Sequence, residues 1–308
     1  MNHGQIYDQK RVLAIHDISC VGRCSLTVAL PILSAAGLNT AVLPTAVLST
    51  HTGGFKGFTC RDLSDDLLPI ARHWSSLNLS FDALYSGYLA STGQIAIVAE
   101  IIDMFKTETG LVLIDPVMGD NGRLYSALTP DMAGEMRKLC SKADVIVPNL
   151  TEAAFLSGEE YFESGYDAAR IERLLVKLTD TGAKAAVLTG VSYDSDTVGA
   201  AGYDAKSGEF FYASRAKVPD VFHGTGDIFA SVLLSAMMNG FSLGGAIEAA
   251  VDFTHRCVAL TGERREKRYG VPFETALPYL IKLLRLPGAA EDLHLPGGDR
   301  PAGVPGRL

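Results

Sequence analysis

Short aliphatic runs that alternate with helix-like segments constrain the fold of this chain more than any other feature. Leu111–Ile114 is entirely aliphatic, which is typical of a strand covered on both faces. Further strands are predicted at residues 12–15, 40–43, 83–86, 145–147 and 185–188, with a hairpin at residues 197–203 and 209–213. Helices are predicted at residues 25–36, 63–74, 130–140, 171–178 and 273–284, from a Ser91 cap to residue 105, after Gly224, after Ser242, and after a Thr151 cap. The alternation predicts an α/β fold with a mostly parallel central sheet and helices on both faces.

The composition is that of an ordinary globular protein. Hydrophobic residues make up 47% of the chain and charged residues 20%, and the net charge of -8 argues against nucleic acid as a partner. No apolar run is long enough to span a bilayer, and residues 1–11 lack the apolar centre of a signal peptide. The odd number of cysteines, without a Cys-x-x-Cys pair, indicates reduced thiols, so we expect a cytoplasmic protein that does not bind membranes.

The alternation continues without a linker. Residues 1–286 are therefore predicted to form one domain. The tail at residues 287–308 is rich in Gly and Pro, and we expect it to be disordered.

Polar residues follow the predicted strands. Ligands of open α/β sheets bind beyond the carboxyl ends of the strands, so these side chains are expected to line one crevice. They are Asp17, Thr45, Tyr88, Asp115, Asn149 and Thr189.

A glycine-rich turn precedes the most apolar predicted helix. In Gly224-Thr225-Gly226-Asp227 the free N–H groups of a helix start can hold an anion, and glycines allow its close approach. A carboxylate at this place would repel that anion. The conflict disappears if Asp227 takes a proton from a hydroxyl that attacks a phosphoryl group held by the turn. The alternative is that Asp227 only complements the helix dipole.

Carboxylates near this turn suit a magnesium ion. Asp115 and Asp120 flank a strand end, and Mg²⁺ usually takes one or two carboxylates together with phosphate oxygens. Loop-forming aspartates are the alternative. Asn149 and Glu152 lie three residues apart at a strand-to-helix junction, where Glu152 could instead complete the first turn of the helix. No P-loop or dinucleotide fingerprint is present.

Together these motifs resemble the ribokinase-like small-molecule kinases, and among them the pyridoxal (vitamin B6) kinases. The likeness covers nearly all of residues 11–285. Gly224-Thr225-Gly226-Asp227 marks the superfamily, whereas Asp115-Pro116-Val117-Met118-Gly119-Asp120, with Gly122 and Tyr125 downstream, is typical of the B6 kinases. The supporting pieces are Thr45 ahead of residues 49–52, residues 86–89, and Pro148-Asn149 with Glu152.

The resemblance implies ATP-dependent phosphorylation of the 5′-hydroxymethyl group of pyridoxal, pyridoxamine or pyridoxine. Asp227 would be the base, and the N–H groups of Gly224, Thr225 and Gly226 would hold the transferring phosphoryl. The other implied sites are Asp115, Asp120 and Glu152 for Mg²⁺, Asn149, Thr189 and Gly226 for the nucleotide, and Asp17, Thr45 and Tyr88 for the substrate.

The chain departs from the B6 kinases at two positions. Asp17 stands where many members have Ser, and a carboxylate there could pair with a pyridinium nitrogen or an amine. Val147 stands where many have the Thr of a potassium site, and it can offer only its carbonyl.

Rival functions are a hydroxymethylpyrimidine or sugar kinase of the same superfamily, and a non-catalytic B6 or nucleotide sensor. A binding protein has no need of the base Asp227. Because exposed edges of such sheets often pair, a homodimer is expected.

Overall fold

A nine-stranded sheet runs through the described part of the chain, which in this computed structural model comprises residues 9–220, 222–262 and 267–286. Its order is β11 (Glu209–Ala216), β10 (Thr197–Asp204), β9 (Ala185–Val191), β8 (Val145–Ile146), β5 (Leu111–Ile114), β4 (Ala83–Ser86), β1 (Arg11–Ser19), β2 (Asn39–Leu48) and β3 (Cys60–Asp62). The strands from β9 to β2 in this order are parallel, and β3, β10 and β11 are antiparallel to their neighbours. The predicted mostly parallel sheet is confirmed.

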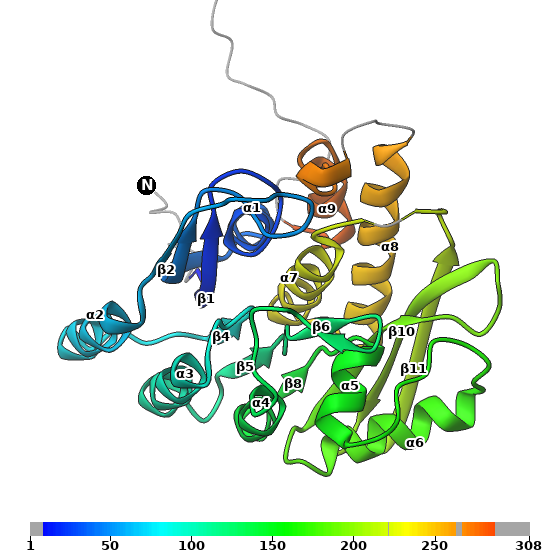
Figure 1. Ribbon diagram of the computed structural model, residues 1–308, viewed down its shortest axis with the longest axis horizontal. Coiled ribbons are helices and arrows are strands. Elements are labelled where there is room, and N and C mark those ends of the chain that lie inside the picture. The colour runs from blue at the N-terminus through cyan, green and yellow to red at the C-terminus, as the bar shows by residue number, and fades with distance from the viewer. Residues whose placement is uncertain (1–8, 221, 263–266, 287–308) are drawn as a thin grey trace, which may run out of the picture.

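Helices cover both faces of this sheet (Figure 1). One layer contains α1 (Leu26–Ala35), α7 (Thr225–Met238), α8 (Leu243–Thr261) and α9 (Leu277–Leu283). The other contains α2 (Ser64–Ser76), α3 (Thr92–Phe105), α4 (Met132–Cys140), α5 (Leu150–Ser157) and α6 (Ala168–Thr179). Two 3-10 turns, Lys267–Tyr269 and Glu274–Ala276, and the small ribbon of β6 (Gly119–Asp120) and β7 (Arg123–Leu124) complete the described elements.

Alternating side chains of β1 supply both hydrophobic cores. Val12 and Ala14 belong to the core under α1 and α7, whereas Leu13 and Ile15 belong to the core on the opposite face. Successive residues of a strand point to opposite faces, so a strand buried on both sides has to be continuously apolar. This explains why the central strands are aliphatic runs.

Capping residues determine where several helices begin. The side chains of Ser91, Asp167 and Ser242 accept hydrogen bonds from the backbone N–H three residues later, at 3.2, 2.8 and 3.2 Å. Each satisfies one of the N–H groups that a helix start leaves unpaired. The predicted Ser91 cap is confirmed.

The order of the strands reverses at β1. The chain passes from β1 to β2 on one side and then places β4, β5, β8 and β9 on the other side. A crevice opens at such a point beyond the carboxyl ends of the strands. The reversal therefore puts the ends of β1 and β4 at the expected ligand site.

Several strands extend further than predicted, and this corrects three placements. Asp17, Thr45 and Thr189 lie inside β1, β2 and β9, not after them. Pairing of β1 with β2 continues beyond an irregularity between His16 and Ile18, and β2 is prolonged by pairing with β3. The sequence analysis missed β3, β6 and β7, because two or three residues carry no periodicity.

Some sequence predictions concern residues that are not described. The tail at residues 287–308, predicted to be disordered, lies outside the described residues. The prediction that residues 1–11 are not a signal peptide concerns residues 1–8, which also lie outside them. The division into one domain and a tail stays a prediction. No helix in the described ranges is both long and apolar enough to cross a membrane.

Candidate active site

The turn at Gly224 closely abuts the loop after β1. Gly224 has a φ of 83°, and a Cβ at this position would lie 2.1 Å from the carbonyl oxygen of Arg23. Only glycine combines this conformation with so close an approach. Because α7 begins at Thr225, the N–H groups of its first turn have no partner within the helix and can bind an anion.

Asp227 lies in that first turn, and its pKa is raised. It is partly buried, and burial raises its pKa to about 7. The backbone N–H of Ser25 donates a hydrogen bond to it and lowers the pKa in part, whereas the negative charge of Asp17 raises it. A carboxyl group with a pKa near neutrality can accept and release a proton under ordinary conditions, as general acid–base catalysis requires.

Asp17 is the second carboxylate of the crevice and is only 4% exposed. Its Oδ1 accepts a hydrogen bond of 2.5 Å from Ser25 Oγ, and its Oδ2 accepts one of 3.2 Å from Ser19 Oγ. Burial raises the pKa of Asp17, and these hydroxyl groups oppose the rise. A charge so enclosed is costly to desolvate unless a cation or donor meets it.

Tyr88 and Thr45, the other two residues predicted to bind the substrate, differ in burial. Tyr88 is half-buried, and the nearby negative charge of Asp17 adds to the burial that raises the pKa of its phenol. Thr45 is only 1% exposed, and its carbonyl accepts hydrogen bonds from Leu63 N at 3.0 Å and Gln94 Nε2 at 3.1 Å. Tyr88 therefore lies near Asp17, whereas the backbone carbonyl of Thr45 ties β2 to Leu63 and Gln94.

Two buried carboxylates come together beside β5. Asp115 follows β5 and is 6% exposed, and Glu152 in α5 is 3% exposed. Burial, followed by the charges of Glu152 and Asp227, raises the pKa of Asp115, and burial raises that of Glu152 to about 8. Carboxylate oxygens are the ligands that Mg²⁺ prefers, so this buried pair fits the implied metal.

Asp120 does not complete a cluster of three ligands. It is exposed in β6 and accepts hydrogen bonds from Asn121 N at 2.9 Å and Asn121 Nδ2 at 3.1 Å. Within the described ranges, no group of three His, Cys, Asp or Glu side chains is arranged to hold a metal. A magnesium ion here would rely on Asp115 and Glu152 together with oxygens of its ligand.

Asn149, and not Thr151, caps α5, which corrects the sequence prediction. Asn149 Oδ1 accepts from Glu152 N at 2.9 Å, and Glu152 Oε2 accepts from Asn149 N at 2.8 Å. This reciprocal pair satisfies two backbone donors at the helix start. Glu152 Oε1 also accepts from Met118 N at 3.1 Å, so the first-turn role of Glu152 is real and ties α5 to the loop after β5.

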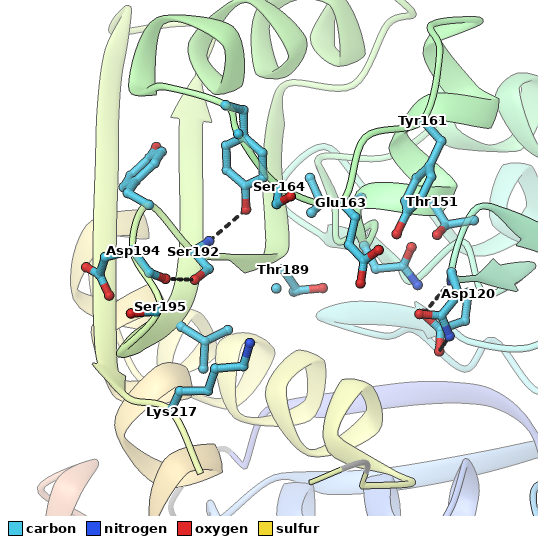
Figure 2. Close-up of a pocket in the computed structure, with 18 residues that line it drawn as sticks. Asp120, Thr151, Tyr161, Glu163, Ser164, Thr189, Ser192, Asp194, Ser195 and Lys217 are labelled. Carbon is cyan, nitrogen blue, oxygen red and sulfur yellow. Dashed lines mark hydrogen bonds between the residues drawn. The ribbon is translucent and has the colours of Figure 1, made fainter. Parts of the chain in front are cut away.

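A cavity of about 780 Å³ lies beyond Asn149 and Thr189 (Figure 2). An isolated parallel bridge joins these two residues, and Thr189 N donates to Pro148 O at 2.9 Å. The lining includes the carboxylates Asp120, Glu163 and Asp194, whereas Lys217 is the single Lys or Arg among the lining residues. In Figure 2 the Lys217 side chain rises into the cavity toward Thr189.

Comparison with known proteins assigns the family. The model of the phosphomethylpyrimidine kinase family matches residues 30–271. The chain belongs to this family. Its match begins after β1, so Asp17 and Ser25 lie outside the matched region.

Relatives of known structure extend the likeness over most of the chain. Pyridoxal kinase from Lactobacillus plantarum is 33% identical, with a TM-score of 0.82, and the match covers 89% of this chain and 97% of that one. A candidate phosphomethylpyrimidine kinase from Bacteroides thetaiotaomicron, whose crystal form contains pyridoxal, is 36% identical, with a TM-score of 0.84 and coverages of 91% and 96%. Pyridoxine/pyridoxal/pyridoxamine kinase from Bordetella avium is 27% identical, covering 81% of this chain and 85% of the relative. The predicted ribokinase-like fold and kinase resemblance are confirmed.

The sequence analysis assigned no site role to three residues that the structure places beside the predicted ones. Ser25 contacts Asp17 and Asp227, Lys217 lines the cavity, and the pKa of Tyr125 is raised by burial and by the charges of Glu152 and Asp120. Tyr125 was recognised only as part of a motif. Ser25 and Lys217 belong to no motif, and their positions shortly before a helix and shortly after a strand are common for polar residues.

Proposed function

We propose that this protein transfers the γ-phosphoryl group of ATP to the 5′-hydroxymethyl group of pyridoxal, pyridoxamine or pyridoxine. The observation that carries the proposal is Asp227, a carboxyl group with a pKa of about 7 in the first turn of α7, at an anion-binding turn. The likeness to the Lactobacillus plantarum pyridoxal kinase, and to a structure that contains pyridoxal, supports this choice of substrate.

Asp227 would act as the general base. The substrate hydroxyl oxygen forms a bond to the γ-phosphorus, its proton passes to the Asp227 carboxylate, and the bond from the γ-phosphorus to the leaving oxygen of ADP breaks. The N–H groups of Gly224, Thr225 and Gly226 would hold the transferring group at the start of α7. Such a transfer depends mainly on positioning and charge neutralisation.

Asp17, Tyr88 and Thr45 are proposed to hold the pyridine substrate. Asp17 is buried close to Tyr88, and its charge is suited to a protonated ring nitrogen or an amine. The half-buried Tyr88 ring offers a flat contact for an aromatic substrate. Thr45, buried within β2, would act on the substrate mainly by shaping the wall of the pocket.

The nucleotide is proposed to occupy the cavity beside Thr189. It would lie along Asn149, Thr189 and Gly226. Asp115 and Glu152 would hold Mg²⁺, with Asp120 acting at a distance or through water. When bound, Mg²⁺ would neutralise charge on the phosphates. The buried Val147 could offer only its carbonyl to a potassium ion. A homodimer and a cytoplasmic location stay predictions.

The test is a coupled ADP-release assay with ATP and, in turn, pyridoxal, pyridoxamine, pyridoxine, hydroxymethylpyrimidine and ribose. Activity confined to the B6 vitamers supports the proposal. Activity with ribose alone contradicts it. Tight binding of a vitamer without turnover would instead identify a sensor.

Hydroxymethylpyrimidine kinase is the second candidate. The matching family carries the phosphomethylpyrimidine kinase description, and two relatives are named as thiamine biosynthesis enzymes. One of them, from Corynebacterium efficiens, is 29% identical over 80% of this chain but only 32% of its own length. A kcat/KM for hydroxymethylpyrimidine above that for every vitamer would establish this alternative.

A further inference from the structure

Ser25 occupies the N-cap position of α1 but does not cap the helix. A serine at this position usually accepts a hydrogen bond from a backbone N–H of the first turn. Here the side chain of Ser25 makes no such bond, and its Oγ donates to Asp17 Oδ1 at 2.5 Å. The hydroxyl group thus supports a carboxylate and leaves the helix start without a side-chain cap.

The backbone of Ser25 adopts a rare conformation that serves a second carboxylate. Its φ is 53° and its ψ is -129°, a region that residues with a Cβ seldom adopt. In this conformation the Ser25 N–H donates to Asp227, while its carbonyl accepts from Val28 N and Ala29 N at 3.0 and 2.9 Å. Strain of this kind persists where the surrounding structure requires it, frequently at functional sites.

Neighbouring contacts hold the turn in place. Ser25 pairs with Ile18 in an isolated antiparallel bridge, and Arg23 N donates to Tyr269 O at 2.9 Å. The Arg23 carbonyl lies against Gly224, as described above. Thr27 Oγ1 donates to Cys24 O at 2.8 Å and to Gly22 O at 3.1 Å. Ser25 is thereby anchored between the end of β1 and the start of α7.

We infer that Ser25 is a positioning residue that joins the substrate-recognising carboxylate to the catalytic base, with its hydroxyl orienting Asp17 and its N–H orienting Asp227. The inference rests on the proposed function of those two residues. One rigid residue between them sets how far the recognised ring stands from the base. It thereby determines which hydroxyl of the substrate meets Asp227.

A double-mutant cycle tests the hydroxyl contact. Ser25→Gly removes the hydroxyl but keeps the N–H and permits positive φ. We expect it to lower kcat/KM for pyridoxal about 10- to 100-fold, the loss typical of a hydrogen bond to a charged group. In an Asp17→Asn background the same change should cost no more than about 3-fold, because the two residues act as a unit. Equal losses in both backgrounds, or a loss below about 2-fold in the wild type, would overturn the inference.

A matched control separates the positioning of Asp17 by Ser25 from a general stabilisation of the turn. Thr27→Val removes a hydroxyl that braces the same turn without contacting either carboxylate. We expect Thr27→Val to lower the melting temperature at least as much as Ser25→Gly while leaving kcat/KM near the wild-type value. Parallel losses of activity in both variants would indicate a merely structural role for Ser25.

A second readout does not require turnover. Carbon-13 NMR titration of the aspartate carboxyl groups should show a higher pKa for Asp17 in Ser25→Gly than in the wild type, because a donor to the charged form is lost. An unchanged Asp17 titration would contradict the inference. Lack of wild-type activity toward every substrate would overturn the proposed function, and this titration would still decide whether Ser25 holds Asp17.

Discussion

At the scale of single residues, buried carboxylates distinguish this site from an ordinary surface crevice. Asp17, Asp115 and Glu152 are all buried, and burial raises the pKa of each. Strongly shifted acids that gather in a crevice are characteristic of catalytic sites, although structural networks shift acids as well. Two substitutions separate these roles.

Asp227→Asn is expected to abolish most turnover while nucleotide binding survives. The amide keeps the shape of the side chain but cannot take the proton, and loss of a general base typically costs about 10²- to 10⁴-fold in rate. Steady-state kcat with pyridoxal, together with calorimetric binding of a nonhydrolysable ATP analogue, measures both effects. A variant with a nearly wild-type rate would reduce Asp227 to a residue that complements the dipole of α7.

Asp17→Ser is expected to lower kcat/KM more for pyridoxamine than for pyridoxal. The buried carboxylate favours a cationic amine, and loss of a charge-assisted hydrogen bond corresponds to about 1.5–3 kcal/mol. The ratio of kcat/KM for the two vitamers, compared between variant and wild type, is the measurement. An unchanged ratio would mean that Asp17 only orders its own turn, through Ser19 and Ser25.

At the scale of elements, the glycine-rich segment at residues 51–58 packs against the 3-10 turn at residues 267–269 and the loop before α7. His51 is buried, and its Nε2 lies 2.5 Å from Arg268 O. The Phe55 ring lies edge-on to the rings of His51 and Tyr269, at centroid distances of 5.1 and 5.5 Å. Gly53 lies against His223, next to the turn at Gly224. These contacts join the segment to residues 268–269 and to the turn before α7, the helix that carries Asp227.

We predict that residues 51–58 act as a lid that tightens over bound substrate. Closure would exclude water that could otherwise accept the phosphoryl group. Hydrogen exchange of this segment should slow when pyridoxal and a nonhydrolysable nucleotide are both present, whereas exchange of α6 provides an internal reference. If the exchange of residues 51–58 is the same with and without ligands, the segment is a static wall.

At the scale of the whole molecule, the large hydrophobic cores stabilise a fold that buries ionisable side chains at its candidate site. Fully burying a large aliphatic side chain contributes about 1.5–3 kcal/mol, and both faces of the sheet are lined with such residues. His16 is fully buried, and burial lowers its pKa to about 3; neither ring nitrogen has a hydrogen-bond partner among the described residues. The shifted groups make the free energy of unfolding depend on pH.

The free energy of unfolding should fall as the pH rises from about 6.5 to 8. In this window folded Glu152 and Asp227, with pKa values of about 8 and 7, retain protons that the unfolded chain has lost. His16 opposes this trend only below its ordinary pKa of 6.5, where the unfolded chain binds the extra proton. One proton of difference corresponds to about 1.4 kcal/mol per pH unit, or roughly 2–4 °C in melting temperature.

Thermal unfolding of the wild type, Glu152→Gln and Asp227→Asn across this pH range provides the check. Each variant should show a shallower decrease of the melting temperature, because one shifted acid has been removed. A wild-type melting temperature that rises between pH 6.5 and 8 would contradict the prediction.

The sequence by itself determined the order of the longer elements, the mostly parallel sheet and the carboxylates proposed for the site. Periodicity and aliphatic runs report local burial, so strands such as β5 and helices such as α3 could be predicted closely. Asp227, Asp115 and Glu152 stand in motifs from which catalytic and metal-binding roles could be proposed, and those roles stay predictions.

Only the tertiary structure decided what those carboxylates contact. The extended β1 and β2, the cap at Asn149 and the link from Ser25 to Asp17 and Asp227 depend on pairing between segments distant in sequence. Burial by the assembled core also raises the pKa of Asp227 to about 7. The periodicity of apolar residues indicates which face of a segment is buried in the core. Contacts between segments form only when the sheet assembles.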